Sequence, residues 1–575
     1  MAPGAPPPQP LVGYALLADG ERGALVGPQG EVVWLCAPRW DSDAVFSHLV
    51  GGPGWYQVCP VQTFVPGGHY EAGSLVWRSR WITHAGILEC REALAFPGDP
   101  HRTVLLRRLT ARSGRTTARI AFEPAAGFGS GRVDRLRRDQ DGVWTADLGG
   151  LRMRWRGARD ARMRGGVLVF EVELTAGQEH DLVLELSDRP LPEPVPPDEL
   201  WRATETAWRQ ALPALGHRDV RHACTVLRGL TGSSGGTVAA ATTSLPERAE
   251  QGRNYDYRYV WIRDLSYIGL AAAAAGAEEM LDGAVRFVTE RLLEHGERLA
   301  PAYTVAGDPI PDQRQLDLPG YPGGFDLVGN TVAHQFQLDA FGESLLLLAE
   351  AARLDRLDGD GHRAVRLAVD AVAARRRQPD SGIWELEPRR WTHSRLSCVA
   401  GLRAAAGNCA LGGRAAEWAA LADRVLAETA ADSLHRSGRW QRAPDDPSVD
   451  AALLLPPLRG ALPPEDPRSL ATLDAVLRDL TEGDFVYRFR HDERPLADAE
   501  GAFLLCGFVL ALAEHALGRE LTARRRYERN RAAGGPAGLY AEEFDVAQSQ
   551  LRGNLPQAFV HALQVEAATR LAGEP

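Results

Sequence analysis

The segment Arg189-Pro190-Leu191-Pro192-Glu193-Pro194-Val195-Pro196-Pro197 divides the chain into two parts of different texture. Proline lacks a backbone N–H and restricts the residue before it, so this run continues neither a helix nor an inner strand. We therefore predict that it links two domains. Residues 1–10 are also rich in proline, and we expect them to form a disordered tail.

Residues 11–188, which precede this linker, consist of short apolar runs separated by glycine, proline and aspartate. Examples are Glu31-Val32-Val33-Trp34-Leu35 and Val167-Leu168-Val169-Phe170-Glu171-Val172. Short strands with frequent turn signals are typical of an antiparallel sandwich. We predict a β-sandwich domain over residues 11–188.

The chain after the linker is dominated by long alanine- and leucine-rich segments with helical spacing. Residues 189–215 are predicted to form the linker and a linking helix, and residues 216–575 a helical domain. Twelve further helices are expected at 217–230, 262–275, 277–295, 330–354, 361–377, 393–407, 412–434, 449–458, 465–480, 499–517, 519–531 and 554–572. Twelve alternating helices fit an (α/α)6 barrel of six inner and six outer helices, with a pocket formed by the loops at one end.

The bulk composition narrows the functional classes. Hydrophobic residues make up 45% and charged residues 24% of the 575, as in ordinary globular proteins, and the length favours more than one domain. The net charge of -10 argues against nucleic acid as a partner, and no apolar run is long enough to cross a membrane. The seven cysteines are scattered and no secretory signal is visible, so we expect a cytoplasmic protein with reduced thiols.

Three predicted connections combine aromatic and acidic residues, and they cover residues 254–264, 381–385 and 538–545. Hydrolysis of a glycosidic bond needs one acid that protonates the departing oxygen and a second that activates water or attacks carbon. Sugar rings also need aromatic platforms and charged hydrogen-bond partners. The first two connections offer five candidates for binding a small carbohydrate, namely Tyr257, Trp261, Arg263, Asp264 and Trp384.

Each candidate also has a plain structural interpretation. Trp384 and Glu385 could cap a helix end, with the acid in solvent. Arg263 and Asp264 could form an ion pair at the start of a helix. The two aromatic residues of the first connection could belong to the core. The residues alone leave these interpretations open.

Several blocks follow one another in a defined order along the chain. They are Gly30-Glu31-Val32-Val33-Trp34-Leu35, Thr242-Thr243-Ser244-Leu245-Pro246-Glu247, Gly382-Ile383-Trp384-Glu385, Glu500-Gly501-Ala502-Phe503 and Asn554-Leu555-Pro556-Gln557. In order and spacing this set resembles glycoside hydrolase family 15, in the bacterial branch that includes glucoamylase-like and trehalase-like enzymes.

The resemblance implies a β-supersandwich followed by an (α/α)6 barrel, which agrees with the domains predicted above. It also implies that Glu385 is the general acid and Glu542 the general base, with Glu543 as the alternative base. The residues that match the family's first sugar subsite are Tyr257, Trp261, Arg263 and Asp264. No cofactor and no metal ion are expected.

The implied activity is exo-acting, inverting hydrolysis of an α-glucoside. It would release β-glucose from the non-reducing end of maltooligosaccharides, isomaltose-type sugars or trehalose. An acid beside Trp384 in a dry pocket is expected to keep its neutral form, whereas Glu542, on the water side, is expected to stay ionised.

Five positions depart from what the family usually shows, namely Tyr255, Leu327, Glu387, Val399 and Arg403. The missing arginine at 327 and the added negative charge at 387 would alter the recognition of sugar hydroxyls. These departures leave an alternative open, in which the same scaffold binds sugar without hydrolysing it or serves a biosynthetic, cyclase-like reaction.

Overall fold

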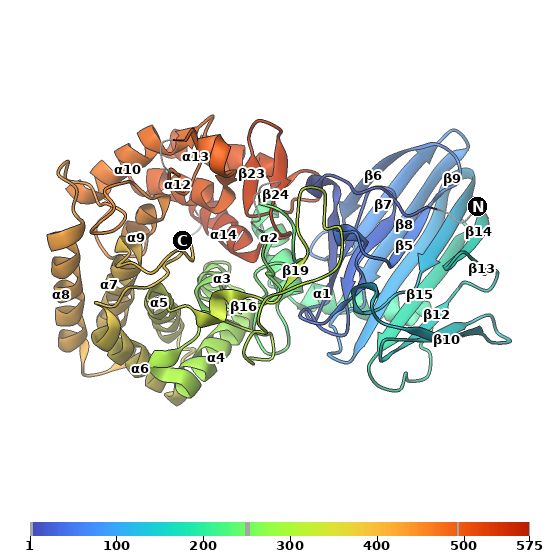
Figure 1. Cartoon of the computed structure of the whole chain (residues 1–575), viewed down its shortest axis with the longest axis horizontal. Helices are drawn as coiled ribbons and strands as arrows, with labels where there is room; N and C mark the ends of the chain where they lie inside the picture. The colour runs from blue at the N-terminus through green and yellow to red at the C-terminus, as the bar shows by residue number, and fades with distance from the viewer. Residues whose placement is uncertain (1–3, 248–253, 492–493, 574–575) are drawn as a thin grey trace.

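The computed structural model describes residues 4–247, 254–491 and 494–573. A β-domain formed by the first part of the chain lies beside a ring of helices formed by the second (Figure 1). The predicted β-supersandwich followed by an (α/α)6 barrel is therefore confirmed.

Two antiparallel sheets form the β-domain and share one long strand, β9 (Arg102–Glu123). The first half of β9 belongs to one sheet and its second half to the other. The first sheet contains β6 (Phe64–Tyr70), β7 (Trp77–Thr83), β8 (Gly86–Leu94), β10 (Val133–Arg138), β11 (Trp144–Leu148), β12 (Leu151–Arg156) and β15 (Glu179–Ser187). The second contains β1 (Ala15–Ala18), β2 (Gly23–Val26), β3 (Glu31–Cys36), β4 (Ala44–Phe46), β5 (Trp55–Pro60), β13 (Arg162–Arg164) and β14 (Val167–Thr175).

Aromatic side chains fill the space between the two sheets. Strand β12 alternates in burial, so that Leu151, Met153 and Trp155 point inward. Trp155 meets Tyr56 of β5 edge to face, with ring centroids 5.7 Å apart, and its indole N–H donates to the Tyr56 hydroxyl at 3.2 Å. The polar atoms of these large residues are thus satisfied inside the core.

The linking helix α1 (Pro197–Gln210) begins at the last residue of the proline run, where a missing N–H costs no hydrogen bond. Its buried side chains face the β-domain, and the ring of Trp208 stacks on Phe96 with centroids 3.9 Å apart. The helix therefore lies between the two domains (Figure 1).

Residues 4–10 of the proline-rich tail, which we expected to be disordered, form contacts with the rest of the chain. Residues 1–3 lie outside the described residues. His48 approaches the Pro6 carbonyl at 2.7 Å, and Tyr321 of the helical domain donates to the Gln9 carbonyl at 2.8 Å. Proline removes a donor but keeps its carbonyl, so an extended proline-rich run can still be held through its acceptors.

Within the residues that the structure describes, six inner helices close a ring in which α14 packs against both α3 and α12. The inner helices are α3 (Ile262–Ala274), α5 (Asp339–Arg353), α7 (Thr392–Gly407), α9 (Leu455–Leu458), α12 (Leu504–Ala516) and α14 (Ala558–Ala572). The outer helices are α2 (Arg218–Leu230), α4 (Glu278–His295), α6 (Gly359–Arg375), α8 (Ala415–Ser433), α10 (Pro467–Asp479) and α13 (Glu520–Arg531). No helix in the described part of the chain has the length and apolar character needed to cross a membrane.

The two rings differ in their pattern of burial. All residues of α12 from Leu504 to Glu514 are buried, because an inner helix has neighbours on every side. The outer helix α10 buries one face only, as expected for a helix between the inner ring and solvent. This difference in burial distinguishes the inner ring from the outer ring.

Four inner helices begin later than predicted. Helix α5 begins at Asp339 instead of 330, α9 at Leu455 instead of 449, α12 at Leu504 instead of 499, and α14 at Ala558 instead of 554. The residues before α12 pair instead with the short strand β23 (Glu543–Asp545), and the Gln557 side chain caps α14. These extended residues lie at the end of the ring where the candidate site is found.

Candidate active site

A cavity of about 430 Å³ lies at the N-terminal ends of the inner helices. All seven residues predicted from the sequence line it, namely Tyr257, Trp261, Arg263, Asp264, Trp384, Glu385 and Glu542. First-turn residues of α3, α12 and α14 also reach it. Helix N-termini carry partial positive charge, so this end of the barrel favours carboxylates and electron-rich sugar oxygens.

Glu385 sits in a backbone conformation that non-glycine residues rarely adopt, with φ of 56°. The turn before it needs Gly382, whose φ is 65° and whose missing Cβ would lie 2.7 Å from the Trp391 ring. Strain of this kind costs about 1–3 kcal/mol and is found at functional sites. The turn directs the Glu385 carboxylate into the cavity, where Trp261 Nε1 donates to its Oε1 at 2.5 Å.

Arg263 connects three polar groups at the floor of the cavity. Its Nε donates to Asp264 Oδ1 at 3.0 Å, and its Nη1 donates to Gln337 Oε1 at 3.1 Å. Its Nη2 lies 3.5 Å from Glu385 Oε1. Burial raises the pKa of Asp264, and the guanidinium acts in the opposite direction. Arg263 and Asp264 therefore form an ion pair at the start of α3, and both residues also line the cavity.

Trp384 lines the cavity, and a hydrogen bond and a ring contact hold its indole in place. Its indole N–H donates to both oxygens of Asp450, at 2.9 and 3.1 Å. Its ring meets Phe503 edge to face, with centroids 5.5 Å apart. A rigid indole held in this way is suited to packing against a sugar ring.

Glu542 lies in the third predicted connection and accepts a hydrogen bond from the Tyr257 hydroxyl, at 3.0 Å to Oε2. Burial raises the pKa of this carboxyl well above its ordinary value, and the nearby charge of Glu247 raises it further. Arg488 and the Tyr257 hydroxyl act in the opposite direction. The raised pKa opposes the expectation that Glu542 stays ionised, although the side chain is only partly buried. Its role as the base stays a prediction.

The alternative base, Glu543, points elsewhere. It begins strand β23, so its side chain and that of Glu542 leave the backbone on opposite sides. Its Oε2 accepts the Gly501 N–H at 2.7 Å, and its side chain is fully buried. Among the described residues that line the cavity, Glu542 is present and Glu543 is not.

The sequence profile of glycosyl hydrolases family 15 matches residues 225–569, which hold every residue of this site. The chain belongs to glycosyl hydrolases family 15. A second profile, described as trehalase-like, N-terminal, matches residues 5–148. The predicted resemblance is thus confirmed, and the protein is a glycoside hydrolase whose substrate is a carbohydrate.

Relatives and structural neighbours extend over nearly the whole chain. The trehalase of Mycolicibacterium smegmatis is 31% identical and covers 98% of this chain and 91% of its own length. The trehalase of Mycobacterium tuberculosis is 30% identical, with 98% and 89% covered. A bacterial glucoamylase crystallised with acarbose shares the fold, with a TM-score of 0.72 at 14% identity over 99% of this chain and 96% of that one.

Several residues that line the cavity were not predicted from the sequence. They are Glu247, Asn330, Gln335, Arg488, His491 and Gln557. Glu247 stands in one of the quoted sequence blocks, so the block order could have pointed to it. Arg488 stands in no quoted block and becomes a candidate only through the fold.

Of the five departures from the family, one reaches the cavity. Tyr255 lines its rim, with 38% of its surface exposed. Val399 is buried inside α7, and Arg403 binds Asp423 and the Ala461 carbonyl on the outer side of that helix. Of these five positions, the one that can contact a bound sugar in the cavity is therefore Tyr255, at the cavity mouth.

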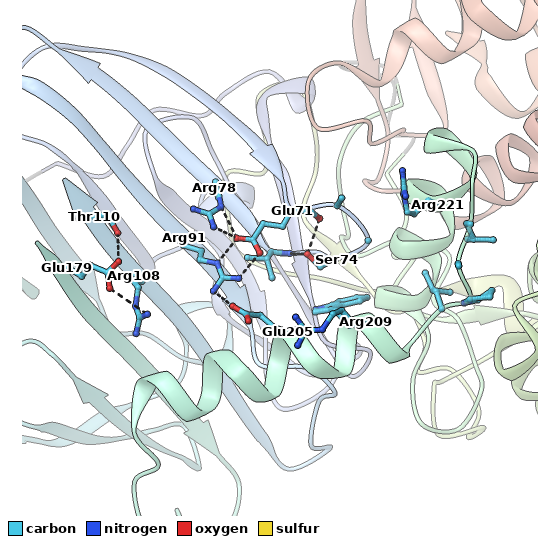
Figure 2. A pocket seen from close by; sticks show the side chains of 18 of the residues that line it. Glu71, Ser74, Arg78, Arg91, Arg108, Thr110, Glu179, Glu205, Arg209 and Arg221 are labelled. Atoms are coloured by element: carbon cyan, nitrogen blue, oxygen red, sulfur yellow. Dashed lines mark hydrogen bonds and ion pairs between the residues drawn. The ribbon is translucent and has the colours of Figure 1, made fainter. Parts of the chain in front are cut away.

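A second, larger pocket of about 770 Å³ lies between the β-domain and α1 (Figure 2). Acidic residues of this pocket form ion pairs with arginines: Glu71 binds Arg78 and Arg91, and Glu205 binds Arg91. Burial alone would raise the pKa of Glu71, but these arginines hold it below its ordinary value. The acids of this pocket are therefore poorly suited to general acid catalysis. A separate finding is that, among the described residues, no cluster of three or more histidines, cysteines or acids could hold a metal ion.

Proposed function

We propose that the protein is an inverting trehalase, which hydrolyses α,α-trehalose to two molecules of glucose. The observation that carries this proposal is the single cavity that Glu385 and Glu542 both line. Relatives named trehalase align with the chain over nearly its whole length, which favours trehalose among the α-glucosides considered above.

In the proposed reaction Glu385 is the general acid and Glu542 the general base. Glu385 gives its proton to the glycosidic oxygen as the bond from that oxygen to the anomeric carbon breaks. Glu542 takes a proton from a water molecule whose oxygen attacks the same carbon from the opposite face. The configuration at that carbon is inverted, and the acid and base return to their starting states with a further proton exchange through water.

The contacts around Glu385 support the role of acid. Its Oε1 accepts from the Trp261 indole and lies near Arg263, so Oε2 is the oxygen left to carry a proton toward substrate. Tyr257, Trp261 and Trp384 supply apolar ring faces, and Arg263 with Asp264 supplies charged partners for sugar hydroxyls.

The size of the cavity supports an exo-acting enzyme for short substrates. Ligand pockets commonly hold roughly 300–1,000 Å³, and this one is near the lower end of that range at about 430 Å³. A disaccharide fits such a space better than the middle of a long polymer does.

The anomers released from trehalose test this proposal. Both glucose units of trehalose are α-linked, so an inverting enzyme releases one unit as β-glucose and the other as α-glucose. Proton NMR in the first minutes of reaction should show equal amounts of the two anomers, and Glu542→Gln should stop the release. Release of α-glucose alone would contradict inversion.

The non-hydrolytic alternative gives a different result. If the scaffold only binds sugar or serves a biosynthetic reaction, purified protein should release no glucose from trehalose, maltose or isomaltose. Calorimetric binding of the same sugars without turnover would favour that alternative. Turnover of maltose or isomaltose in place of trehalose would keep the reaction type and change the proposed substrate.

A further inference from the structure

Asp380 closes the loop that carries the candidate acid. Its backbone N–H donates to the Arg389 carbonyl at 2.8 Å, and the Arg389 N–H donates to the Asp380 carbonyl at 2.9 Å. Residues 381–388, with Trp384 and Glu385 among them, therefore form a loop between two paired residues. Only 1% of the Asp380 surface is exposed, so its carboxyl group is shielded from solvent.

One oxygen of this carboxyl group accepts from three separate segments. Asp380 Oδ1 accepts the Gly382 N–H and the Ser394 hydroxyl, both at 2.8 Å. The Leu338 N–H, at 3.4 Å, is a weaker third donor. Ser394 lies in the first turn of α7, and Leu338 directly precedes α5. A single acceptor thus ties the turn that begins at Gly382 to the starts of two inner helices.

The turn from Gly382 to Glu385 needs an external anchor because its backbone is strained. Both residues have positive φ, 65° and 56°, and this conformation is unfavourable for the glutamate. The Glu385 N–H donates to the Gly382 carbonyl at 3.1 Å, which closes the turn locally but does not orient it in the barrel. Its first residues are held from outside, since the Ser381 N–H donates to the Phe336 carbonyl at 2.8 Å and the Gly382 N–H to Asp380. Strained backbone persists only where its surroundings over-determine it.

The second oxygen of Asp380 indicates a neutral carboxyl group. Oδ2 is buried and has no hydrogen-bond partner among the described residues. Burial raises the pKa of Asp380 well above its ordinary value, and the charge of Asp339 raises it further, whereas the Ser394 hydroxyl lowers it. Arg395 is a cation in the same neighbourhood, and its Nη1 donates to Asp432 at 2.8 Å. The contacts therefore require an accepting oxygen at Oδ1 more than they require a charge.

We propose that Asp380 is a positioning residue, which holds the turn at residues 382–385 so that the Glu385 carboxyl group faces the glycosidic oxygen. This inference rests on the proposed function. Asp380 is not among the described residues that line the cavity, so it touches neither the substrate nor the reacting atoms. It acts as an acceptor through Oδ1, and the proton balance of the reaction is unchanged.

Two variants separate the accepting oxygen from the rest of the side chain. Asp380→Asn keeps an oxygen that can accept the Gly382 N–H and puts a neutral amide in place of the neutral carboxyl group. Its kcat on trehalose should stay close to that of wild type. Asp380→Ala removes the acceptor, and the freed turn should lower kcat on trehalose about 10²-fold with little change in KM. A comparable loss in folded Asp380→Asn would overturn the inference.

The substrate α-glucosyl fluoride distinguishes a misplaced acid from general damage. Fluoride leaves without a proton from the enzyme, so Asp380→Ala should lose much less kcat on this substrate than on trehalose. Loss by the same factor on both substrates would overturn the inference. Asp358→Ala is the matched control, because Asp358 accepts the Gly361 N–H at 2.8 Å at the start of the outer helix α6. It should lower the midpoint of thermal unfolding and leave kcat unchanged.

The Trp261 indole gives a measurement without turnover. Its Nε1–H donates to Glu385 Oε1, so its nitrogen-15 NMR signal, identified by its absence in Trp261→Phe, reports where that carboxyl group lies. The signal should move in Asp380→Ala and stay in place in Asp380→Asn. An unmoved signal in folded Asp380→Ala overturns the inference. A moved signal in Asp380→Asn overturns it too, also where Asp380→Ala does not fold.

Failure of the proposed function gives a different result from failure of this inference. Wild type would then release no glucose from trehalose, whereas the Trp261 indole signal would still show whether Asp380 holds the turn.

Discussion

The turn at residues 382–385 determines where the candidate acid points. Gly382 and Glu385 both have positive φ, so the carboxylate enters the cavity at the cost of local strain. Glu385→Gln keeps the shape of the side chain and the oxygen that accepts from Trp261, and it removes the proton that a departing glucose needs. We expect kcat on trehalose to fall about 10²–10⁴-fold with little change in the thermal unfolding midpoint.

A substrate with a good leaving group provides the control for this prediction. Fluoride leaves from α-glucosyl fluoride without needing a proton from the enzyme. Glu385→Gln should therefore hydrolyse that substrate much faster than it hydrolyses trehalose, whereas Glu542→Gln should fail on both. Equal loss on both substrates in Glu385→Gln would show that the residue is not the acid.

The sequence predicted the acids and the aromatic residues of the site better than their electrostatic surroundings. Glu385 and Trp384 stand in one short block, so their neighbourhood is visible in the sequence. Glu247 and Arg488 approach Glu542 from segments far away in the chain, and their charges act through space. Their effect on the candidate base depends on packing that a linear pattern does not contain.

Helices α5 and α7 cross closely, with a glycine on each side of the contact. A Cβ on Gly401 of α7 would lie 2.3 Å from the Gly342 carbonyl oxygen of α5. Gly401→Ala should therefore push the two helices apart and destabilise the protein by about 1–3 kcal/mol or more, despite the better helix propensity of alanine. A lower midpoint of thermal unfolding would show this.

Gly407 gives a matched control in the same helix. It is exposed at the last position of α7, and a Cβ there would meet nothing within 4 Å. Gly407→Ala should be neutral or stabilising by up to about 1 kcal/mol. If the two variants lost the same stability, the close crossing of α5 and α7 would not explain the effect of Gly401→Ala.

At the scale of elements, sequence periodicity identified the helices well and the starts of some inner helices poorly. Helix α12 is a long apolar run, so its existence is plain in the sequence. Its first residue depends on the pairing of residues 502–503 with β23, some forty residues further along the chain. Inner helices begin where such distant pairings end, and these pairings also carry the cavity residues.

At the scale of the whole molecule, the β-domain anchors both segments that surround Glu542. Trp34 of the β-domain donates its indole N–H to the Ala241 carbonyl at 2.8 Å, which fixes the segment that leads to Glu247. Arg258 donates from Nη1 to the Ser42 carbonyl at 2.8 Å, which fixes the segment that carries Tyr257. The domain that lacks the candidate acids therefore contributes to the geometry of the site.

Arg258 tests this coupling because it is buried and joins the two domains. Its guanidinium binds both oxygens of Asp256, at 2.9 and 2.7 Å, and only 2% of its surface is exposed. Arg258→Met would leave the Asp256 charge buried without its partner, at a cost of about 3–5 kcal/mol. Calorimetry should show a clear fall in the unfolding midpoint.

The exposed interdomain pair Arg314–Asp43, with its atoms 3.4 Å apart, gives the control, since Arg314→Ala should change stability by at most about 1 kcal/mol. Equal effects of the two variants would mean that the buried contact does not hold the domains together.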